Sequence, residues 1–263
     1  MRAPRLLLVL ASLSAGAVAA AELHPLDEDL GGPPSRYAEA LRALVVRRAP
    51  LAPEDPGSSP LRLTCLATPG DAKYVGIVQE MEIAAPLSAV KAILDDVPRY
   101  KDLFPDCVDV HEVPGSRSGN RYVTAWEQRV PVFFLPNTRF ELTYLVSWID
   151  EGRVVYRYRL ARPGDLTNSD GVIALEAAGP ERTRFTEYDF FNAQWGLLPE
   201  GMVWREALRG ALLSDLAIKL KAENPAWPFA RIASESERLR GAAAGELARC
   251  PRERRPAGDL LPP

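Results

Sequence analysis

Side chains that could exchange protons occur in two close pairs of acids along the sequence. Asp95 and Asp96 are adjacent on a predicted helix, so their carboxyl groups point in different directions. Glu187 and Asp189 are two residues apart on a predicted strand, which places both on one face together with Phe185. A carboxyl group among aromatic rings has a raised pKa and can serve as a general acid. Glu187 or Asp189 could therefore act as a general acid, so an enzymatic function stays an alternative.

Other catalytic and metal-binding patterns are absent from the sequence. It contains no GxSxG, HExxH or GxGxxG motif and no phosphate loop. His24 and His111 are far apart, and no two of Cys65, Cys107 and Cys250 form a CxxC pair, which argues against a zinc site. An oxidising compartment would allow one disulfide, and the sequence leaves open whether one forms and between which cysteines. We therefore predict no catalytic residue, no metal and no cofactor.

The overall composition is that of a globular protein without a basic surface. Hydrophobic residues make up 47% of the chain, which is ample for a core. The net charge of -3 excludes the basic footprint that nucleic-acid binding requires, so no nucleic acid is expected as a partner. We expect a monomer that makes no more than transient contact with membranes.

The first residues have the pattern of a secretory signal peptide. Arg2 and Arg5 precede an apolar run over 6–13, and small residues follow through Ala21. This run is too short to span a bilayer, which takes about 20 residues. We expect cleavage after Ala21 and export of a soluble protein, with a bacterial periplasm as the compartment that fits best.

Periodicity predicts an α+β domain that begins with a strand and ends with a long helix. The first elements are a strand over Tyr74–Ala84, a helix over Pro86–Val97 and a short helix over Arg99–Phe104. Turn-forming residues then separate six β segments, as expected for an antiparallel meander. These segments are Cys107–Val113, Arg121–Val130, Thr138–Asp150, Arg153–Leu160, Gly171–Ala178 and Thr183–Asn192.

The remaining patterns complete the domain organisation. A helix beginning near Ser35 precedes a Pro-rich linker, a long helix covers Gly201 to about Glu223, and another helix covers Phe229–Leu247. We therefore divide the chain into a signal peptide (1–21), an N-terminal helix and linker (22–60), a ligand-binding domain (61–224), and a helical extension with a disordered tail (225–263).

Two of the predicted strands have one clearly apolar face. In the first strand every second residue from Phe140 to Trp148 lies on the apolar face, and in the second every second residue from Val154 to Leu160 does. The opposite face of the second strand carries Arg153, Arg157 and Arg159 and is suited to solvent. On the long helix, small residues that include Ala207, Gly210, Ala211 and Ser214 fall on one side, and Arg205, Arg209, Asp215 and Lys219 are expected to point outward. Small residues opposite aromatic rings either allow close packing or leave a cavity, and the residues alone leave both open.

One stretch before the meander carries a family resemblance. Asp96-Val97, Tyr100, Leu103-Phe104-Pro105 and Cys107 resemble a pattern found in coenzyme Q-binding members of the START-like superfamily, which also includes polyketide cyclases and lipid-transport proteins. The order of elements from about Tyr74 to Asn224 resembles the same superfamily. The sequence departs from the pattern at Leu103 and Asp106 and in its export signal. The simplest interpretation of Tyr100 and Phe104 is that they pack the short helices against the opening of the sheet.

The resemblance implies a helix-grip fold, in which a curved antiparallel sheet wraps around a long C-terminal helix and encloses an apolar pocket. The function it implies is that of an exported binding or transport protein for a lipid, isoprenoid or similar apolar ligand. The alternative is a cyclase- or dehydratase-like enzyme that uses Glu187 or Asp189 in the same pocket. The expected lining residues are Trp126, Phe140, Tyr144, Tyr156, Tyr158, Trp204, Leu208 and Ala211.

Overall fold

The computed structural model describes Leu30 and residues 61–67, 75–130, 136–193, 198–242, 247, 250 and 255–256. The signal peptide, the helix near Ser35 and the Pro-rich linker lie outside these residues, so they stay predictions. No helix within the described ranges is long and apolar enough to cross a bilayer.

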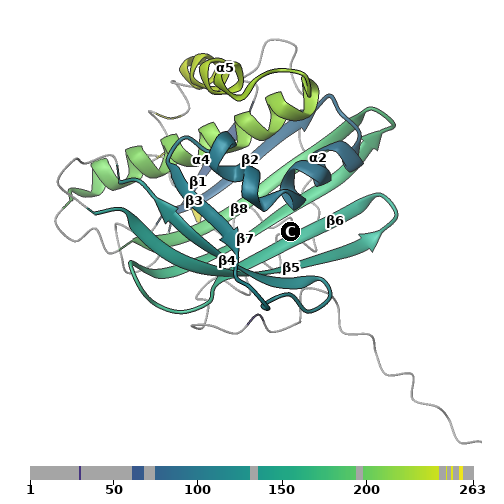
Figure 1. Cartoon of the computed structure of the whole chain (residues 1–263). Helices are drawn as coiled ribbons and strands as arrows, with labels where there is room; N and C mark the ends of the chain where they lie inside the picture. The colour runs from purple at the N-terminus through teal and green to yellow at the C-terminus, as the bar shows by residue number, and fades with distance from the viewer. Residues whose placement is uncertain are drawn as a thin grey trace, which may run out of the picture.

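A strongly curved, mainly antiparallel sheet forms the body of the protein (Figure 1). The strand order is β3-β4-β5-β6-β7-β8-β2-β1-β9, so the meander closes by pairing its last long strand, β8, with β2. Only the short β9 runs parallel to its neighbour, β1. The strands are β1 (Arg62–Ala67), β2 (Val75–Ile83), β3 (Cys107–Glu112), β4 (Arg121–Gln128), β5 (Thr138–Asp150), β6 (Arg153–Leu160), β7 (Leu166–Gly179), β8 (Arg182–Ala193) and β9 (Arg255–Pro256).

The helices lie on one side of this sheet. The long α4 (Glu200–Glu223) and α2 (Leu87–Asp95) lie over the same face, and α5 (Phe229–Ala242) packs against α4 on the side away from the sheet (Figure 1). Prolines set the ends of α4: Pro199 directly precedes its first residue, and Asn224, which precedes Pro225, ends it. Between α2 and β3 the chain forms the short turns η1 (Val97–Arg99) and α3 (Tyr100–Leu103). The predicted α+β helix-grip architecture is thereby confirmed.

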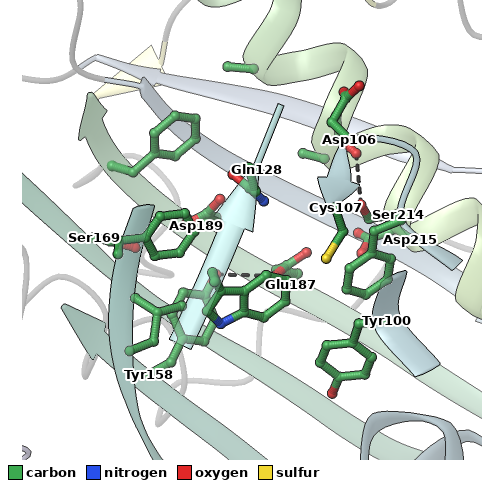
Figure 2. A pocket seen from close by; sticks show the side chains of 18 of the residues that line it. Tyr100, Asp106, Cys107, Gln128, Tyr158, Ser169, Glu187, Asp189, Ser214 and Asp215 are labelled. Carbon is green, nitrogen blue, oxygen red and sulfur yellow. Dashed lines mark hydrogen bonds between the residues drawn. The ribbon is translucent and has the colours of Figure 1, made fainter. Parts of the chain in front are cut away.

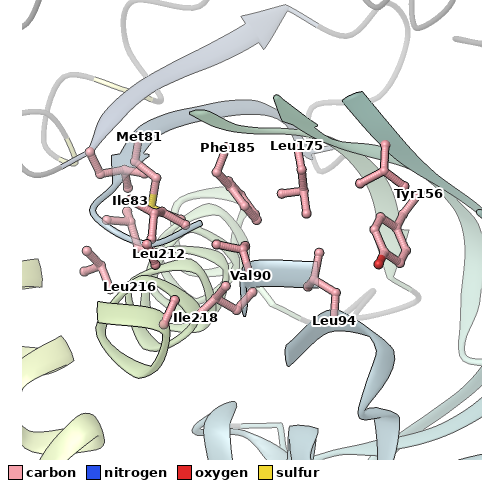
Figure 3. Close-up of a cluster of buried hydrophobic side chains, with 14 residues drawn as sticks. Met81, Ile83, Val90, Leu94, Tyr156, Leu175, Phe185, Leu212, Leu216 and Ile218 are labelled. Atoms are coloured by element: carbon pink, nitrogen blue, oxygen red, sulfur yellow. The ribbon is translucent and has the colours of Figure 1, made fainter. Parts of the chain in front are cut away.

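A hydrophobic cluster joins the sheet to α2 and α4 at one end of the domain (Figure 3). Phe185 of β8 and Leu175 of β7 meet Leu212 and Leu216 of α4, and Val90 of α2 completes the contact. All five side chains are buried. Each contributes about 1.5–3 kcal/mol through removal of its apolar surface from water, so this cluster fixes α4 against the sheet.

The structure corrects several details of the predicted elements. β1 was not predicted, and β7 begins at Leu166 instead of Gly171. Within the tail that we expected to be disordered, Arg255–Pro256 forms β9. Trp148, expected on the covered face of β5, is 52% exposed.

The arginine-bearing face of β6 also differs from its predicted exposure to solvent. Arg153 is buried, and Arg159 donates to Asp170 of the neighbouring β7 at 2.8 Å. The two residues are direct partners in the strand register, so an ion pair across the strands replaces contact with water.

A disulfide bond joins Cys65 of β1 to Cys250, with Cα atoms 5.2 Å apart. The sequence left this pairing open. The bridge lies in a buried cluster with Val75, Trp204 and Leu208, so it anchors the segment that follows α5 to the edge of the sheet. Cys107 is the free cysteine of the described residues.

Candidate functional site: a cavity with aromatic walls and buried acids

A cavity of about 210 Å³ lies between the sheet and α4 (Figure 2). Strands β4 to β8 supply one wall, and the other comes from one side of α4 together with the turn around α3. Both apolar and ionisable side chains face the enclosed space, so the cavity combines room for an apolar body with a local polar site.

The sheet wall is built from aromatic side chains in cross-strand contact. Trp126 of β4 is the register partner of Phe140 of β5, and their rings stack with centroids 6.0 Å apart. Tyr144 of β5 is the partner of Tyr158 of β6, with centroids 5.5 Å apart. Because alternate residues of a strand share a face, clean alternation in the sequence is sufficient to gather these rings.

The short helical turns close one end of this wall. Tyr100 lies 5.6 Å from the ring of Trp126, and Phe104 stacks on the same indole at 6.2 Å. The Tyr100 hydroxyl donates to the carbonyl oxygen of Leu94. This placement matches the packing role that the sequence indicated for both residues, and both also line the cavity.

The helix wall is made of small residues. Ala207, Gly210, Ala211 and Ser214 of α4 line the cavity. A β-carbon at Gly210 would meet open space. The Ser214 hydroxyl donates a hydrogen bond to the carbonyl oxygen of Gly210 at 2.9 Å, within the helix. Side chains this short cannot reach the rings of the sheet, so the space between them stays open.

Six of the eight residues that the sequence placed at the site are brought together here: Trp126, Phe140, Tyr144, Tyr156, Tyr158 and Ala211. Trp204 and Leu208 do not line the cavity. They pack with Val75 and Ile77 of β2 and with Cys65 of β1. Because β1 was not predicted, the surface that covers this part of α4 was missing from the sequence-based picture. Ligand contact by the six lining residues stays a prediction.

Three carboxyl groups, which we call the acid cluster, face the same cavity: Glu187 and Asp189 of β8 and Asp215 of α4 (Figure 2). Tyr158 donates its hydroxyl to Glu187 Oε1 at 3.1 Å, and Gln79 Nε2 lies 3.5 Å from Glu187 Oε2. Asp215 lies close enough to Glu187 for a hydrogen bond between their side chains, and Asp189 lies close to the same Tyr158 hydroxyl. A hydrogen bond between two carboxyl groups requires a proton, so Glu187 and Asp215 hold at least one between them.

The position of Asp215 overturns our expectation that this residue points outward. Its side chain is buried, with 1% exposure. Asp215 follows Ala211 by four residues and precedes Ile218 by three, so helical spacing places it on the stripe that lines the cavity. The spacing was visible in the sequence, but the charged residue type was given more weight than its position.

Burial governs the protonation of the acid cluster. Desolvation raises the pKa of Asp215 and that of Asp189 well above the usual value for aspartate, and the nearby charge of Glu187 adds to both shifts. Desolvation also raises the pKa of Glu187, while hydrogen bonds from Asp215 and Tyr158 oppose that rise. Burial and the closeness of the two carboxyl groups therefore keep at least one of Glu187 and Asp215 protonated.

Gly171 of β7 gives Tyr158 the space to reach Glu187. The two residues are register partners, and a β-carbon at Gly171 would overlap the phenol ring of Tyr158. A glycine is therefore required here by the close approach of the ring and not by its backbone angles.

Replacing Gly171 with alanine is expected to displace the Tyr158 ring and to lower the free energy of unfolding by about 1–3 kcal/mol, the usual cost of overpacking. Urea denaturation measures the change. Gly152→Ala is the matched control, because there a new methyl group makes ordinary contacts at 3.6 and 3.7 Å. Adding Tyr158→Leu to Gly171→Ala should recover part of the loss, whereas equal stability of Gly171→Ala and wild type would contradict this account.

One end of the cavity is lined by Asp106, Cys107 and the exposed Arg129. Arg209 links α4 to this end of the cavity and to α5, because its guanidinium donates to Asp106 at 3.2 Å and to Glu237 of α5 at 3.1 Å. Burial raises the pKa of Cys107 to about 12, so its thiol is neutral at physiological pH and is not an activated nucleophile. Among the described residues no group of His, Cys, Asp and Glu could hold a metal ion.

A curved antiparallel sheet that grips a long C-terminal helix over an internal cavity is the START-like fold, and this chain has that fold. Solved structures with the same architecture include human STARD10, at 13% sequence identity and a TM-score of 0.52 over 82% of this chain and 85% of that one. The human StarD13 lipid transfer and protein localization domain is similar at 11% identity and a TM-score of 0.50, over 72% of this chain and 98% of that one.

An aromatase/cyclase, Zhui from Streptomyces sp. R1128, is similar at 18% identity and a TM-score of 0.45, over 65% of this chain and 98% of that one. At these identities the likeness shows the fold alone. No protein-family model and no curated protein matches the sequence.

Proposed function

We propose that the protein binds and carries an apolar small molecule or part of a lipid in the cavity between the sheet and α4. The observation that carries this proposal is the pairing of aromatic rings on the sheet with Ala207, Gly210 and Ala211 on the helix, which leaves about 210 Å³ unfilled. Burying an apolar chain there is favourable by about 0.8 kcal/mol per CH₂. The START-like fold supports a role of this kind.

The size of the cavity limits the ligand. Pockets for drug-sized ligands usually measure about 300–1,000 Å³, and this cavity is smaller. A single short chain or a compact ring system therefore fits better than a two-chain lipid.

Mass spectrometry of the purified protein under native conditions, before and after organic extraction, tests the proposal. A bound apolar compound that extraction removes would support it. Titration with N-phenyl-1-naphthylamine, a neutral probe that fluoresces in apolar surroundings, is the second measurement. No bound compound together with no fluorescence increase would overturn the proposal.

The proposed place of action is a periplasm reached through the signal peptide. The disulfide between Cys65 and Cys250 supports this, since such bonds persist in oxidising compartments. N-terminal sequencing of the exported protein should find Glu22 first, and a cytosolic product that keeps Met1 would contradict export.

A second candidate function is a cyclase- or dehydratase-like reaction in the same cavity. The adjacent carboxyl groups of Glu187 and Asp215 favour it, because two carboxyl groups that share a proton can act as acid and base. A bound compound that wild type alters and Glu187→Gln returns unaltered would support the enzyme over the carrier.

A further inference from the structure

The acid cluster contains more hydrogen-bond acceptors than the protein satisfies. Asp215 Oδ2 is buried and has no hydrogen-bond partner among the described residues. The donors close to these groups are the Tyr158 hydroxyl and Gln79 Nε2, and both lie at Glu187. A buried polar atom without a partner costs about 1–3 kcal/mol, so this end of the cavity is built for a ligand that brings donors.

No cation of the described residues faces the acid cluster. The groups that act on its three members are Tyr158 of β6, Asp170 of β7 and the backbone of Phe190 in β8, besides the cluster itself. Asp170 is already paired with Arg159 at 2.8 Å. The one basic residue of the described chain that lines the cavity is Arg129, which is exposed.

Three classes of polar head group can be compared for this position. A carboxylate or phosphate would find no cation here to offset its own charge, because only acids line this position. A hydroxyl group brings one donor. An ammonium group brings three donors and a positive charge, so it can satisfy Asp215 Oδ2 while it neutralises the carboxylates that a dry site otherwise disfavours.

We propose that the natural ligand is an apolar amine whose ammonium group sits among Glu187, Asp189 and Asp215 while its apolar body lies against the aromatic wall. The inference rests on the proposed function, because it names the class of ligand for the same cavity. Tyr158 orients Glu187, and Gly171 permits Tyr158 to do so.

The protonation of the cluster gives this ligand a pH signature. In the empty cavity burial raises the pKa values of Asp189 and Asp215 and so favours their protonated forms. A bound ammonium group stabilises the ionised form and expels protons, so binding weakens as pH falls. An alkylamine keeps its own charge up to about pH 10. Affinity should therefore rise with pH across the neutral range.

Isothermal titration calorimetry with n-octylamine, 1-octanol and octanoate at pH 7.5 tests the inference with three probes of equal chain length. We expect octylamine to bind at least about tenfold more tightly than octanol, the factor that 1.4 kcal/mol represents, and octanoate to bind most weakly. In Glu187→Gln/Asp215→Asn the preference for the amine over octanol should fall to about twofold or less. The exposed Glu181→Gln is the matched control and should behave as wild type.

Two further results separate the possible failures. Equal affinity for octylamine and octanol, or a preference that survives in the double variant, would overturn the amine inference and leave the carrier function standing. Failure of all three probes to bind would overturn both. If circular dichroism shows that the double variant does not fold, the test is made on the wild-type protein alone. Calorimetric titrations of wild type in two buffers of different ionisation enthalpy should show proton release on binding of octylamine and none on binding of octanol. The absence of proton release with octylamine would overturn the inference.

Discussion

Replacing Ala211 with tryptophan is expected to abolish uptake of apolar ligands, with a loss of at least about 100-fold in affinity for N-phenyl-1-naphthylamine. Ala211 lies on the helix wall opposite the aromatic rings. An indole at this position would occupy the space that the small side chains of α4 leave open. The loss expected is about 2.8 kcal/mol in binding free energy at 1.4 kcal/mol per tenfold, and fluorescence titration measures it.

The stability of the same variant distinguishes a cavity from a filled core. Bulk added to a filled core costs about 1–3 kcal/mol, whereas a cavity accepts the ring with little loss. Arg205→Trp, on the same helix at an exposed side chain, controls for the introduction of an indole. An Ala211→Trp protein that melts far below wild type yet still binds the probe would contradict the cavity as the binding site.

Replacing Asp215 with asparagine is expected to raise the melting temperature of the ligand-free protein at alkaline pH. The pKa of Asp215 is raised in the folded state by burial, so the folded protein binds this proton more tightly than the unfolded chain does. The resulting stabilisation is complete below the unfolded pKa of about 3.9 and is lost as pH rises through the folded value. Asparagine carries no charge at any pH, and its amide can still donate to Glu187.

We therefore expect wild type and Asp215→Asn to melt together near pH 4 and to diverge as pH rises. A gain of 1 kcal/mol corresponds to about 2–4 °C for a domain of this size, and differential scanning fluorimetry from pH 4 to 9 measures it. Glu181→Gln, on an exposed turn, should show no such divergence. A difference between wild type and Asp215→Asn that shrinks as pH rises would contradict the buried, protonated state of Asp215.

Most of the fold that could be predicted from the sequence was predicted from the alternation of apolar and polar residues along the strands. The bounds of β5 and β6 were predicted to the residue, because apolar and polar side chains alternate along most of both strands and turn-forming residues flank them. The aromatic wall followed from the same alternation. β1 has no such pattern, since its sequence RLTCLA mixes residue types and its place is fixed by pairing with β2 and by the bond from Cys65 to Cys250.

The acid cluster shows where sequence reasoning reaches its limit. Glu187 and Asp189 were recognised as a pair because they are close in the chain. Asp215 joins them because α4 packs over the sheet; its helical spacing indicated the side of α4 on which it lies, but not which strand residues it would meet. Residue type was also misleading, since a charged side chain on a long helix is usually solvated. The burial of Arg153 on β6 is a second case of the same kind.

The bond between Cys65 and Cys250 makes the domain a closed covalent ring, because nearly all of the described elements lie within the 185 residues that separate the two cysteines. A protease that cuts one surface loop inside this ring opens it without releasing a fragment. The nicked protein stays a single molecule, because the disulfide still joins the parts on either side of the cut. In the periplasm that we propose as its location, where disulfides persist, a single cleavage would then leave the two parts of the domain joined until a reductant opened the bridge.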